Sequence, residues 1–238
     1  MRIGSLLLTC EHGGNQVPSE YAFLFATARA RRALAGHRGH DPGALPLAKT
    51  LARALDAELI HATTTRLLVE LNRSRGHPAL FSAFSRPLDV RARAAVIERY
   101  YVPHRERVFA AIEARLARGA LVCHIGVHSF APVLDGHRRS ADIGLLYDPA
   151  RRYEASVCAA WQHALLGCDP TLRVRRNYPY RGKADGLTTA LRARFAGDRY
   201  VGIELETNQA LVASASPKRR VVTQALVSSL RKMLQARF

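Results

Sequence analysis

Four short apolar runs in this sequence each end in residues that can bind a metal ion or a polar substrate. The first run, residues 6–9, is followed by Cys10, Glu11, His12 and a pair of glycines. A buried strand that stops at a sheet edge presents such side chains there, and glycines let other groups approach closely. The later runs have the same form and lie in residues 68–73, 123–130 and 200–206. We therefore predict one site, built where several strands end.

Strand-like runs alternate with longer segments of helical periodicity along the chain. Strands are expected at residues 5–9, 58–62, 66–71, 120–127, 143–147 and 200–205. Helices are expected at residues 46–55, 88–118, 153–166, 184–196 and 216–236. This alternation predicts an α/β fold with a mixed, mostly parallel sheet that is flanked by helices. A chain of 238 residues fits a single domain, 1–238, with a sizeable core.

Three residues indicate where these helices begin or break. Pro103 is expected to divide the segment 88–118 into two helices, because proline removes a backbone donor inside a helix. Asp185 is expected to cap the segment 184–196, and Pro217 suits the first position of the last helix. Residues 168–182 give the least distinct pattern of the chain.

The apolar residues and the cysteines exclude several classes of protein. No stretch reaches the roughly 18 consecutive apolar residues that a membrane span needs. The apolar run at 6–8 is too short for the core of a signal peptide, so we expect a cytoplasmic protein without membrane contact. The four cysteines contain no Cys-x-x-Cys pair, which argues against a zinc ribbon or a thioredoxin-type motif.

The formal net charge of +17 raises the question of nucleic-acid binding. The arginines are scattered along helix-like segments, few aromatic residues lie between them, and no block forms a basic tail. This distribution favours a solvated, arginine-rich surface, so a nucleic-acid partner is not expected. The charge is also suited to attracting anionic substrates.

Two histidines at the ends of apolar runs predict a metal site. A hydrolytic zinc site uses three protein ligands and a water, and His12 and His128 are the first two candidates. Three residues compete for the third position. Asp41 precedes a helix, where its alternative role is an N-cap. Glu11 is awkward because successive side chains of an extended segment point in opposite directions, and His40 is the remaining option.

The other candidate residues are carboxylates and arginines near the ends of the later runs. Glu204 ends a strand and could take a proton from water and return it to a leaving amine. Glu206 is expected to face the same side of that strand. Arg73, which follows Asn72, could grip a substrate carboxylate with two hydrogen bonds. Arg66 could face an oxygen on which negative charge develops.

Together, these segments resemble the N-formylglutamate amidohydrolase family. The resemblance is carried by residues 9–18, 41–44, 66–74, 128–130 and 202–206, and the intervening segments 100–104 and 142–146 are similar as well. It runs from about residue 6 to about residue 209, nearly the whole chain. The order and the number of these segments make the resemblance fairly specific.

The resemblance implies a fold and a set of roles. The family is similar to the zinc carboxypeptidases and to acylases that act on acylated aspartate or glutamate, which implies a carboxypeptidase-like architecture and one zinc ion per chain. Glu204 would then be the general base and acid, and Arg66 would polarise the scissile carbonyl. The other implied roles are zinc binding by His12, Asp41 and His128 and substrate binding by Asn72, Arg73 and Ser129.

The chain also departs from the carboxypeptidase pattern. Those enzymes carry a Glu three residues after the first zinc-binding His, where this chain has Asn15, so the third ligand must come from elsewhere and Asp41 fits best. Glu206 stands where carboxypeptidases carry a basic residue. The expected function is zinc-dependent hydrolysis of an N-acyl amino acid, with N-formylglutamate as one candidate. A zinc peptidase acting on small or cell-wall peptides and a non-catalytic basic binding protein are the alternatives.

Overall fold

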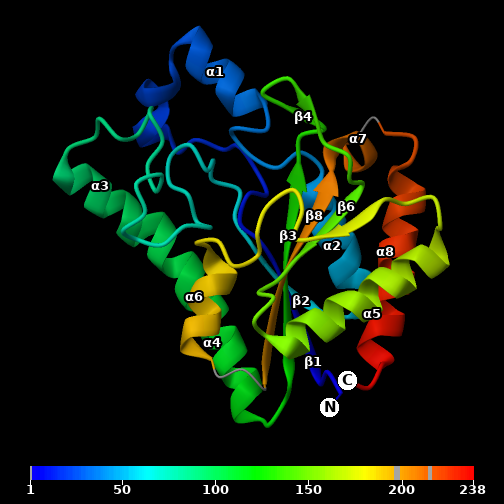
Figure 1. The fold of residues 1–238 in the computed structure, drawn as a ribbon. Helices are drawn as coiled ribbons and strands as arrows, with labels where there is room; N and C mark the ends of the chain where they lie inside the picture. The colour runs from blue at the N-terminus through cyan, green and yellow to red at the C-terminus, as the bar shows by residue number, and fades with distance from the viewer. Residues whose placement is uncertain (1, 196–198, 214–215) are drawn as a thin grey trace.

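A six-stranded sheet forms the centre of the computed structural model, which describes residues 2–195, 199–213 and 216–238 (Figure 1). The strand order is β2-β1-β3-β8-β6-β7. The first four of these strands are parallel, whereas β6 is antiparallel to β8 and parallel to β7. Their bounds are Ser5–Cys10 for β1, Glu58–His61 for β2, Val122–Phe130 for β3, Ile143–Leu146 for β6, Val174–Arg176 for β7 and Tyr200–Asn208 for β8. The mixed, mostly parallel sheet of the prediction is confirmed.

Helices cover both faces of this sheet. On one face lie α2 (Ala44–Leu55), α5 (Arg152–Cys168) and α8 (Arg219–Gln235), and on the other lie α4 (Val102–Ala117) and α6 (Leu187–Arg194) (Figure 1). Apolar side chains of the strands pack against each layer, which gives two separate core clusters. The smaller elements are η1 (Ser19–Phe25), α1 (Ala28–Ala35), α3 (Val90–Val96), η2 (Ile97–Tyr101), α7 (Gln209–Val212) and the hairpin of β4 (Val133–Leu134) and β5 (His137–Arg138).

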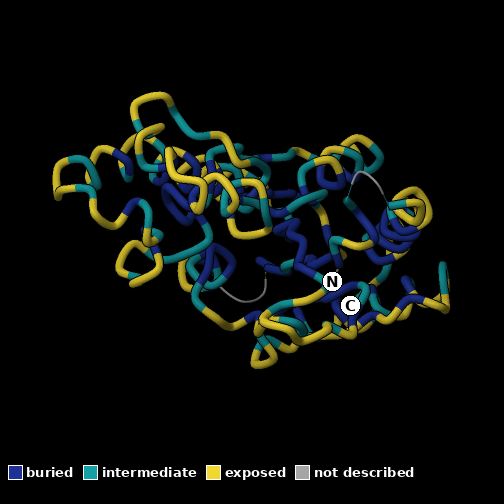
Figure 2. Tube along the Cα trace, turned by 90° about the horizontal axis from the view of Figure 1, so that it is seen from above, coloured by how far each residue is buried: buried dark blue, intermediate teal, exposed yellow. Residues whose placement is uncertain are grey.

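The strands of the sheet carry different residues on their two faces. In β3, Ile125 and Val127 belong to the core under α2, α5 and α8, whereas the alternate residues His124 and His128 face the opposite side. β8 repeats the pattern in register, because Gly126 pairs with Glu204 and His128 pairs with Glu206. Figure 2 shows the buried segments passing through the middle of the molecule, with exposed loops around them.

The predicted strand at residues 66–71 is wrong. This segment is a turn followed by irregular chain, in which the backbone N–H of Leu68 donates to the carbonyl of Thr65. Its apolar residues are buried all the same, because Leu68, Val69 and Leu71 pack in a cluster of their own beside α3 and η2. The strand β7 lies in the segment that gave the least distinct pattern, and no strand was predicted there.

Three details of the predicted helices also need correction. The chain stays helical from Val90 to Ala117, and Pro103 lies in the first turn of α4, where a missing donor is tolerated. Gly186, not Asp185, precedes α6, and α6 ends at Arg194; residue 196 lies outside the described residues. Pro217 lies in a turn before α8, which begins at Arg219. Within the part of the chain that the structure describes, no helix is long and apolar enough to cross a membrane.

Candidate active site

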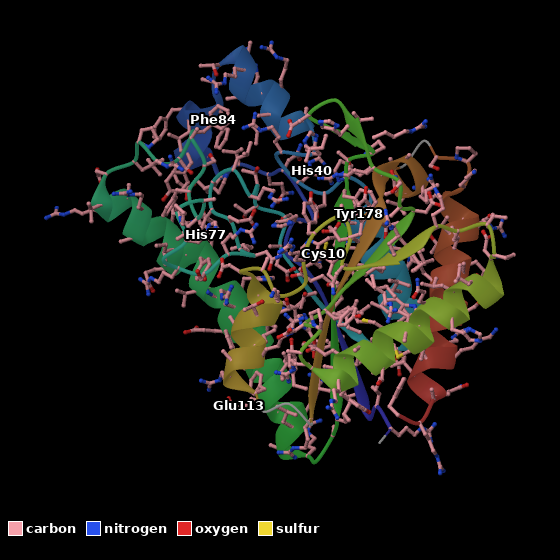
Figure 3. The ribbon with its side chains drawn as sticks, viewed as in Figure 1. Cys10, His40, His77, Phe84, Glu113 and Tyr178 are labelled. Carbon is pink, nitrogen blue, oxygen red and sulfur yellow. The ribbon has the colours of Figure 1, made fainter. Side chains whose placement is uncertain are left out.

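The ends of β1, β3 and β8 meet at one side of a cavity of about 410 Å³. In Figure 3, Cys10 marks the end of β1, and Tyr178 marks the segment between β7 and α6 that supplies another part of the wall. The lining side chains are mostly charged or polar: His12, Asp41, Arg66, Asn72, Arg73, His128, Ser129, Tyr180, Arg181, Asp185, Glu204 and Glu206, with Ala184 beside them. All eight site residues predicted from sequence line this cavity. His128 and Ser129 come from β3, Glu204 comes from β8, and Arg66, Asn72 and Arg73 come from the segment 66–73. His12 and Asp41 lie in the chain between β1 and α2.

Three buried side chains in this cavity could hold a metal ion. Nδ1 of His12 lies 3.3 Å from Oδ2 of Asp41, and Nδ1 of His128 lies 3.1 Å from the same oxygen. The ligand atoms of all three residues lie within 4.8 Å of one another. In a tetrahedral zinc site with bonds of about 2.0–2.1 Å, neighbouring ligand atoms are about 3.3 Å apart, so these separations suit such an ion.

The backbone directs Asp41 toward the two histidines. His12 lies two residues after the end of β1, and its carbonyl accepts a hydrogen bond from the N–H of Asp41 at 2.9 Å. Gly43 then turns the chain into α2 with φ of +85°, a conformation that favours glycine. A Cβ at this position would also collide with the backbone of Val212, so the turn after Asp41 depends on glycine.

Each candidate histidine ligand has a carboxylate at its other ring nitrogen. Nε2 of His12 faces Oε1 of Glu70, and Nε2 of His128 lies 3.1 Å from Oε2 of Glu11, as a charge contact without hydrogen-bond alignment. Oε1 of Glu11 also lies 3.4 Å from Nε2 of His104. Histidines that bind metals usually contact such an outer group, which fixes the ring and its tautomer. The residues present therefore fit a zinc ion with two imidazoles and one carboxylate as ligands.

The pKa values at this cluster follow from the same contacts. Burial lowers the pKa of His128, but the hydrogen bond to Asp41 and the charge contact with Glu11 outweigh it and raise that pKa well above its usual range. The pKa of Asp41 is lowered, because the contacts with His12, His128 and Arg66 outweigh burial. The cluster thus holds its carboxylate ionised, which is the form that binds a cation.

Arg66 lies between two carboxylates of the cluster. Its Nε donates to Oε2 of Glu70 at 2.7 Å, and its Nη1 donates to Oδ1 of Asp41 at 3.2 Å. Its Nη2 forms an ion pair with the same Glu70 oxygen at 2.6 Å. These contacts fix Arg66 at the cavity wall, where its side chain remains 28 % exposed.

Glu204 lies in the cavity with one of its oxygens held in place. Its Oε1 accepts hydrogen bonds from Nδ2 of Asn72 at 3.3 Å and from Oγ1 of Thr188 at 3.1 Å. The other end of the Asn72 amide accepts from the N–H of Leu187 at 2.7 Å. Asn72 therefore ties Glu204 to the start of α6 through both ends of its amide.

Glu206 is buried in the cavity, and its Oε2 has no hydrogen-bond partner among the residues that the structure describes. Burial and the neighbouring carboxylates of Asp41 and Glu204 raise its pKa to about 8. Because carboxylates are rarely left unpaired in a protein interior, this oxygen is a candidate contact for a substrate or a water.

The remaining predicted residues have structural partners. Nη1 of Arg73 donates to the carbonyls of Asn72 and Asp185. Oγ of Ser129 donates to the carbonyl of Pro42 at 2.8 Å, and the N–H of Ser129 donates to Asp41 at 3.3 Å. His40 does not belong to the metal-binding cluster.

Several residues of the site were not predicted from the sequence, among them Glu70, Tyr180 and Arg181. Glu70 lies within the run that was expected to be a strand, where an alternating pattern could have marked it as a polar residue of the site face. Tyr180 and Arg181 come from the segment with the least distinct pattern, and no local signal pointed to them.

Similarity to known proteins extends over nearly the whole chain. A family model described as N-formylglutamate amidohydrolase matches residues 4–213. The structure of a gene product of Agrobacterium tumefaciens superposes with a TM-score of 0.80 at 29% identity and covers 98% of this chain and 92% of its own. N-formylglutamate amidohydrolase from Ralstonia eutropha superposes with a TM-score of 0.73 at 20% identity, with 97% and 94% covered, and so shares the fold. No curated protein sequence gives a significant match.

Proposed function

Because the chain belongs to the N-formylglutamate amidohydrolase family, whose model spans residues 4–213, we propose that it is a zinc-dependent hydrolase of N-acyl amino acids. The acyl group is a formyl or another small group, and N-formylglutamate is the first substrate to test. One observation carries the proposal. The buried cluster of His12, Asp41 and His128 lines the same cavity as Glu204, so a cation site and a proton acceptor share one space.

The three residues of the cluster would hold one divalent ion per chain. His12 and His128 would bind it through Nδ1, because Glu70 and Glu11 lie at the opposite nitrogens. When bound, such an ion supplies Lewis-acid polarisation of a carbonyl and makes a coordinated water more acidic.

Glu204 serves as the general base and acid. Asn72 and Thr188 hold Oε1, and Oε2 has no hydrogen-bond partner within the described ranges, so this oxygen is available to a water in the cavity. It takes a proton from the attacking water and returns it to the nitrogen of the leaving amine. The water oxygen bonds to the amide carbon, the C–N bond breaks, and the products are a short acid and a free amino acid.

Arg66 stabilises the negative charge that develops on the carbonyl oxygen. A guanidinium has five N–H donors, and the contacts with Glu70 and Asp41 use three of them. The remaining donors and the exposed part of the side chain allow Arg66 to contact substrate. Its ion pairs also hold the carboxylate of Asp41 in the orientation that the metal site requires.

The other residues orient the site and bind the amino-acid half. Ser129 fixes the loop of Asp41 through hydrogen bonds to both Asp41 and Pro42. Asn72 fixes Glu204. Arg73 keeps Nε and Nη2 without partners in the described part of the chain, so it can still hold one substrate carboxylate. A cavity of about 410 Å³ is of the size that small-molecule sites have.

Metal analysis and an amine-release assay test the proposal. The purified protein should contain about one zinc per chain and should release free amino acid from N-formylglutamate, in a panel with N-acetylglutamate, N-formylmethionine and a dipeptide. Glu204→Gln should retain the metal and lower kcat by roughly 10²- to 10⁴-fold, the usual contribution of a positioned base. Glu113→Gln, at an exposed ion pair with Arg194, is the control and should leave both readouts unchanged.

Two outcomes would count against the proposal. A protein that binds no divalent ion after reconstitution would remove the metal site. A protein that cleaves the dipeptide and none of the acylated amino acids would be a peptidase instead.

A further inference from the structure

The segment between β7 and α6 is held firmly against the sheet. Oδ1 of Asn177 accepts hydrogen bonds from the N–H groups of Tyr147 at 3.0 Å and Gly182 at 3.1 Å. Nη1 of Arg192 donates to the carbonyl of Gly182 at 2.6 Å. A Cβ at Gly182 would collide with the backbone of Tyr147, so only glycine allows this close approach. Residues 177–182 therefore have a defined position at the cavity.

Tyr180 of this segment is fixed as well. Nη1 of Arg139 donates to its hydroxyl at 3.0 Å, and the Arg139 guanidinium lies 4.9 Å from the centre of its ring. Arg139 also lies over the ring of Phe130, at the end of β3. Tyr180 thus links its segment to the end of β3, and Arg181 follows it directly.

The three arginines of the cavity differ in what they contact. Arg66 is bound to two carboxylates, and Arg73 donates to two main-chain carbonyls. The guanidinium of Arg181 has no hydrogen bond, ion pair or ring contact with any residue that the structure describes, although Arg181 lines the cavity. Its side chain is exposed, and among the described residues none uses any of its five N–H donors. All five are therefore available to a ligand in the cavity.

The charges of the cavity favour an unpaired cation as the partner of an anionic substrate. Four carboxylic residues line it, namely Asp41, Asp185, Glu204 and Glu206. Those carboxyl groups that are ionised would repel a substrate that carries two carboxylates, and an unpaired guanidinium offsets this repulsion while offering a planar, two-pronged contact. Arg73 has donors for one of the two substrate carboxylates, which leaves the second without a partner unless Arg181 supplies it.

We propose that Arg181 binds the side-chain carboxylate of the amino-acid half and so selects N-acyl derivatives of acidic amino acids. This inference rests on the proposed hydrolase function and extends it to substrate selection. Arg181 and Arg73 then hold the two carboxylates of one substrate, and the scissile amide lies between them and the metal ligands.

Paired substrates test this assignment directly. N-formylglutamate and N-formylglutamine have nearly the same shape, but the glutamine side chain is neutral. Arg181→Ala should lower kcat/KM for N-formylglutamate by roughly 10- to 100-fold, because it removes a charged hydrogen bond, and should change kcat/KM for N-formylglutamine far less. Arg181→Lys should recover part of the loss, because lysine keeps the charge without the planar fork. Lys183→Ala, at an exposed neighbouring cation that does not line the cavity, is the matched control.

The results separate this inference from the function on which it rests. Equal losses for both substrates, or no loss for either, would overturn the role of Arg181 while hydrolysis by the unmodified protein still supports the function. If the unmodified protein hydrolyses neither substrate, calorimetric binding of L-glutamate and L-glutamine to the zinc-loaded protein decides. A preference for glutamate that disappears in Arg181→Ala supports Arg181, and a preference that persists overturns it.

Discussion

Near the cavity, the two faces of the central sheet use the same strands for opposite purposes. On the face under α2, α5 and α8, the strands contribute apolar residues such as Ile125, Val127 and Ile203. On the other face, the neighbouring positions of β3 and β8 hold His128, Glu204 and other polar groups. Successive side chains of a strand point to opposite faces of the sheet. One buried strand can therefore stabilise the fold with one set of residues and position the site residues with the other.

Away from the cavity, polar residues on this face are buried as deeply as the apolar ones on the other, and the groups at Thr9, His124 and Tyr200 are paired. Oγ1 of Thr9 lies 2.9 Å from Nε2 of His124, and Nδ1 of His124 lies 2.9 Å from the hydroxyl of Tyr200. All three side chains are fully buried. A buried polar group without a partner is costly, so this row of hydrogen bonds allows polar residues to replace a hydrophobic core beside the cavity.

Substitution of the neighbouring residues His128 and Val127 in β3 should give the largest difference, with metal binding lost in one variant and stability lowered in the other. His128→Ala removes a metal ligand, and we expect metal affinity to fall by more than the roughly 10- to 100-fold that loss of an outer partner causes, with activity at background. Val127→Ala, one residue away on the apolar face, should lower the melting temperature and retain the metal. Metal content and melting curves of both variants check this. Full metal binding by His128→Ala would break the assignment.

A second pair of substitutions, at Ile203 and Glu204 in β8, separates stability from catalysis. Ile203 is fully buried in the core, and Ile203→Ala should lower the free energy of unfolding by about 2–5 kcal/mol, because it leaves a cavity. Its effect on kcat at a temperature where the variant is folded should be small. Denaturant unfolding and steady-state kinetics measure the two quantities, with Glu204→Gln as the opposite case. A stable Ile203→Ala protein would show that the apolar face packs loosely.

Much of this division could be predicted from the sequence. The runs that became β1, β3 and β8 are apolar at the core positions and end in His12, the segment 128–129 and Glu204, so the pattern contained both the strands and the site. Parallel strands bring their carboxyl ends to one edge, which made convergence of these residues expected. Whether Asp41, Glu11 or His40 joins them depends on how a loop folds back, and the sequence left that choice open.

The failures have a common physical cause. The run at 66–71 is as apolar as a strand, but its backbone is satisfied by other means: the N–H of Glu70 donates to the carbonyl of Leu80, and Ser82 and Ser85 donate to the carbonyl of Leu67. An apolar pattern reports burial and not the hydrogen-bond partner. The sequence also contained no signal for Arg181. Its position depends on hydrogen bonds at residues 177 and 182, which local periodicity does not reveal.

A smaller effect is expected from the carboxylate behind His128. Glu11→Gln keeps the size of the side chain and removes its charge, so the ring of His128 loses an ionic partner but not its place. Zinc affinity should fall by roughly 10- to 100-fold, the usual result for such outer groups. Competition with a coloured chelator measures it, with Glu58→Gln, at an exposed ion pair, as the control. An unchanged affinity would mean that Glu11 serves only His104.

The smallest effect should come from the paired polar row, and only in acid. Burial lowers the pKa of His124 to about 4, whereas an unfolded histidine has a pKa near 6.5. Between these values the unfolded chain binds the extra proton, so His124 leaves stability unaffected above pH 6.5 and lowers it as the pH falls toward 4. From pH 7 to pH 5 this amounts to about 2 kcal/mol. The comparison is made in metal-free protein, where His12 and His128 are the same in the unmodified protein and in the variant. On acidification from pH 7 to pH 5, His124→Gln should lose about 2 kcal/mol less stability than the unmodified protein. If acid lowers the stability of both proteins equally, His124 is protonated in the folded state. The polar face of the sheet would then accommodate a buried charge.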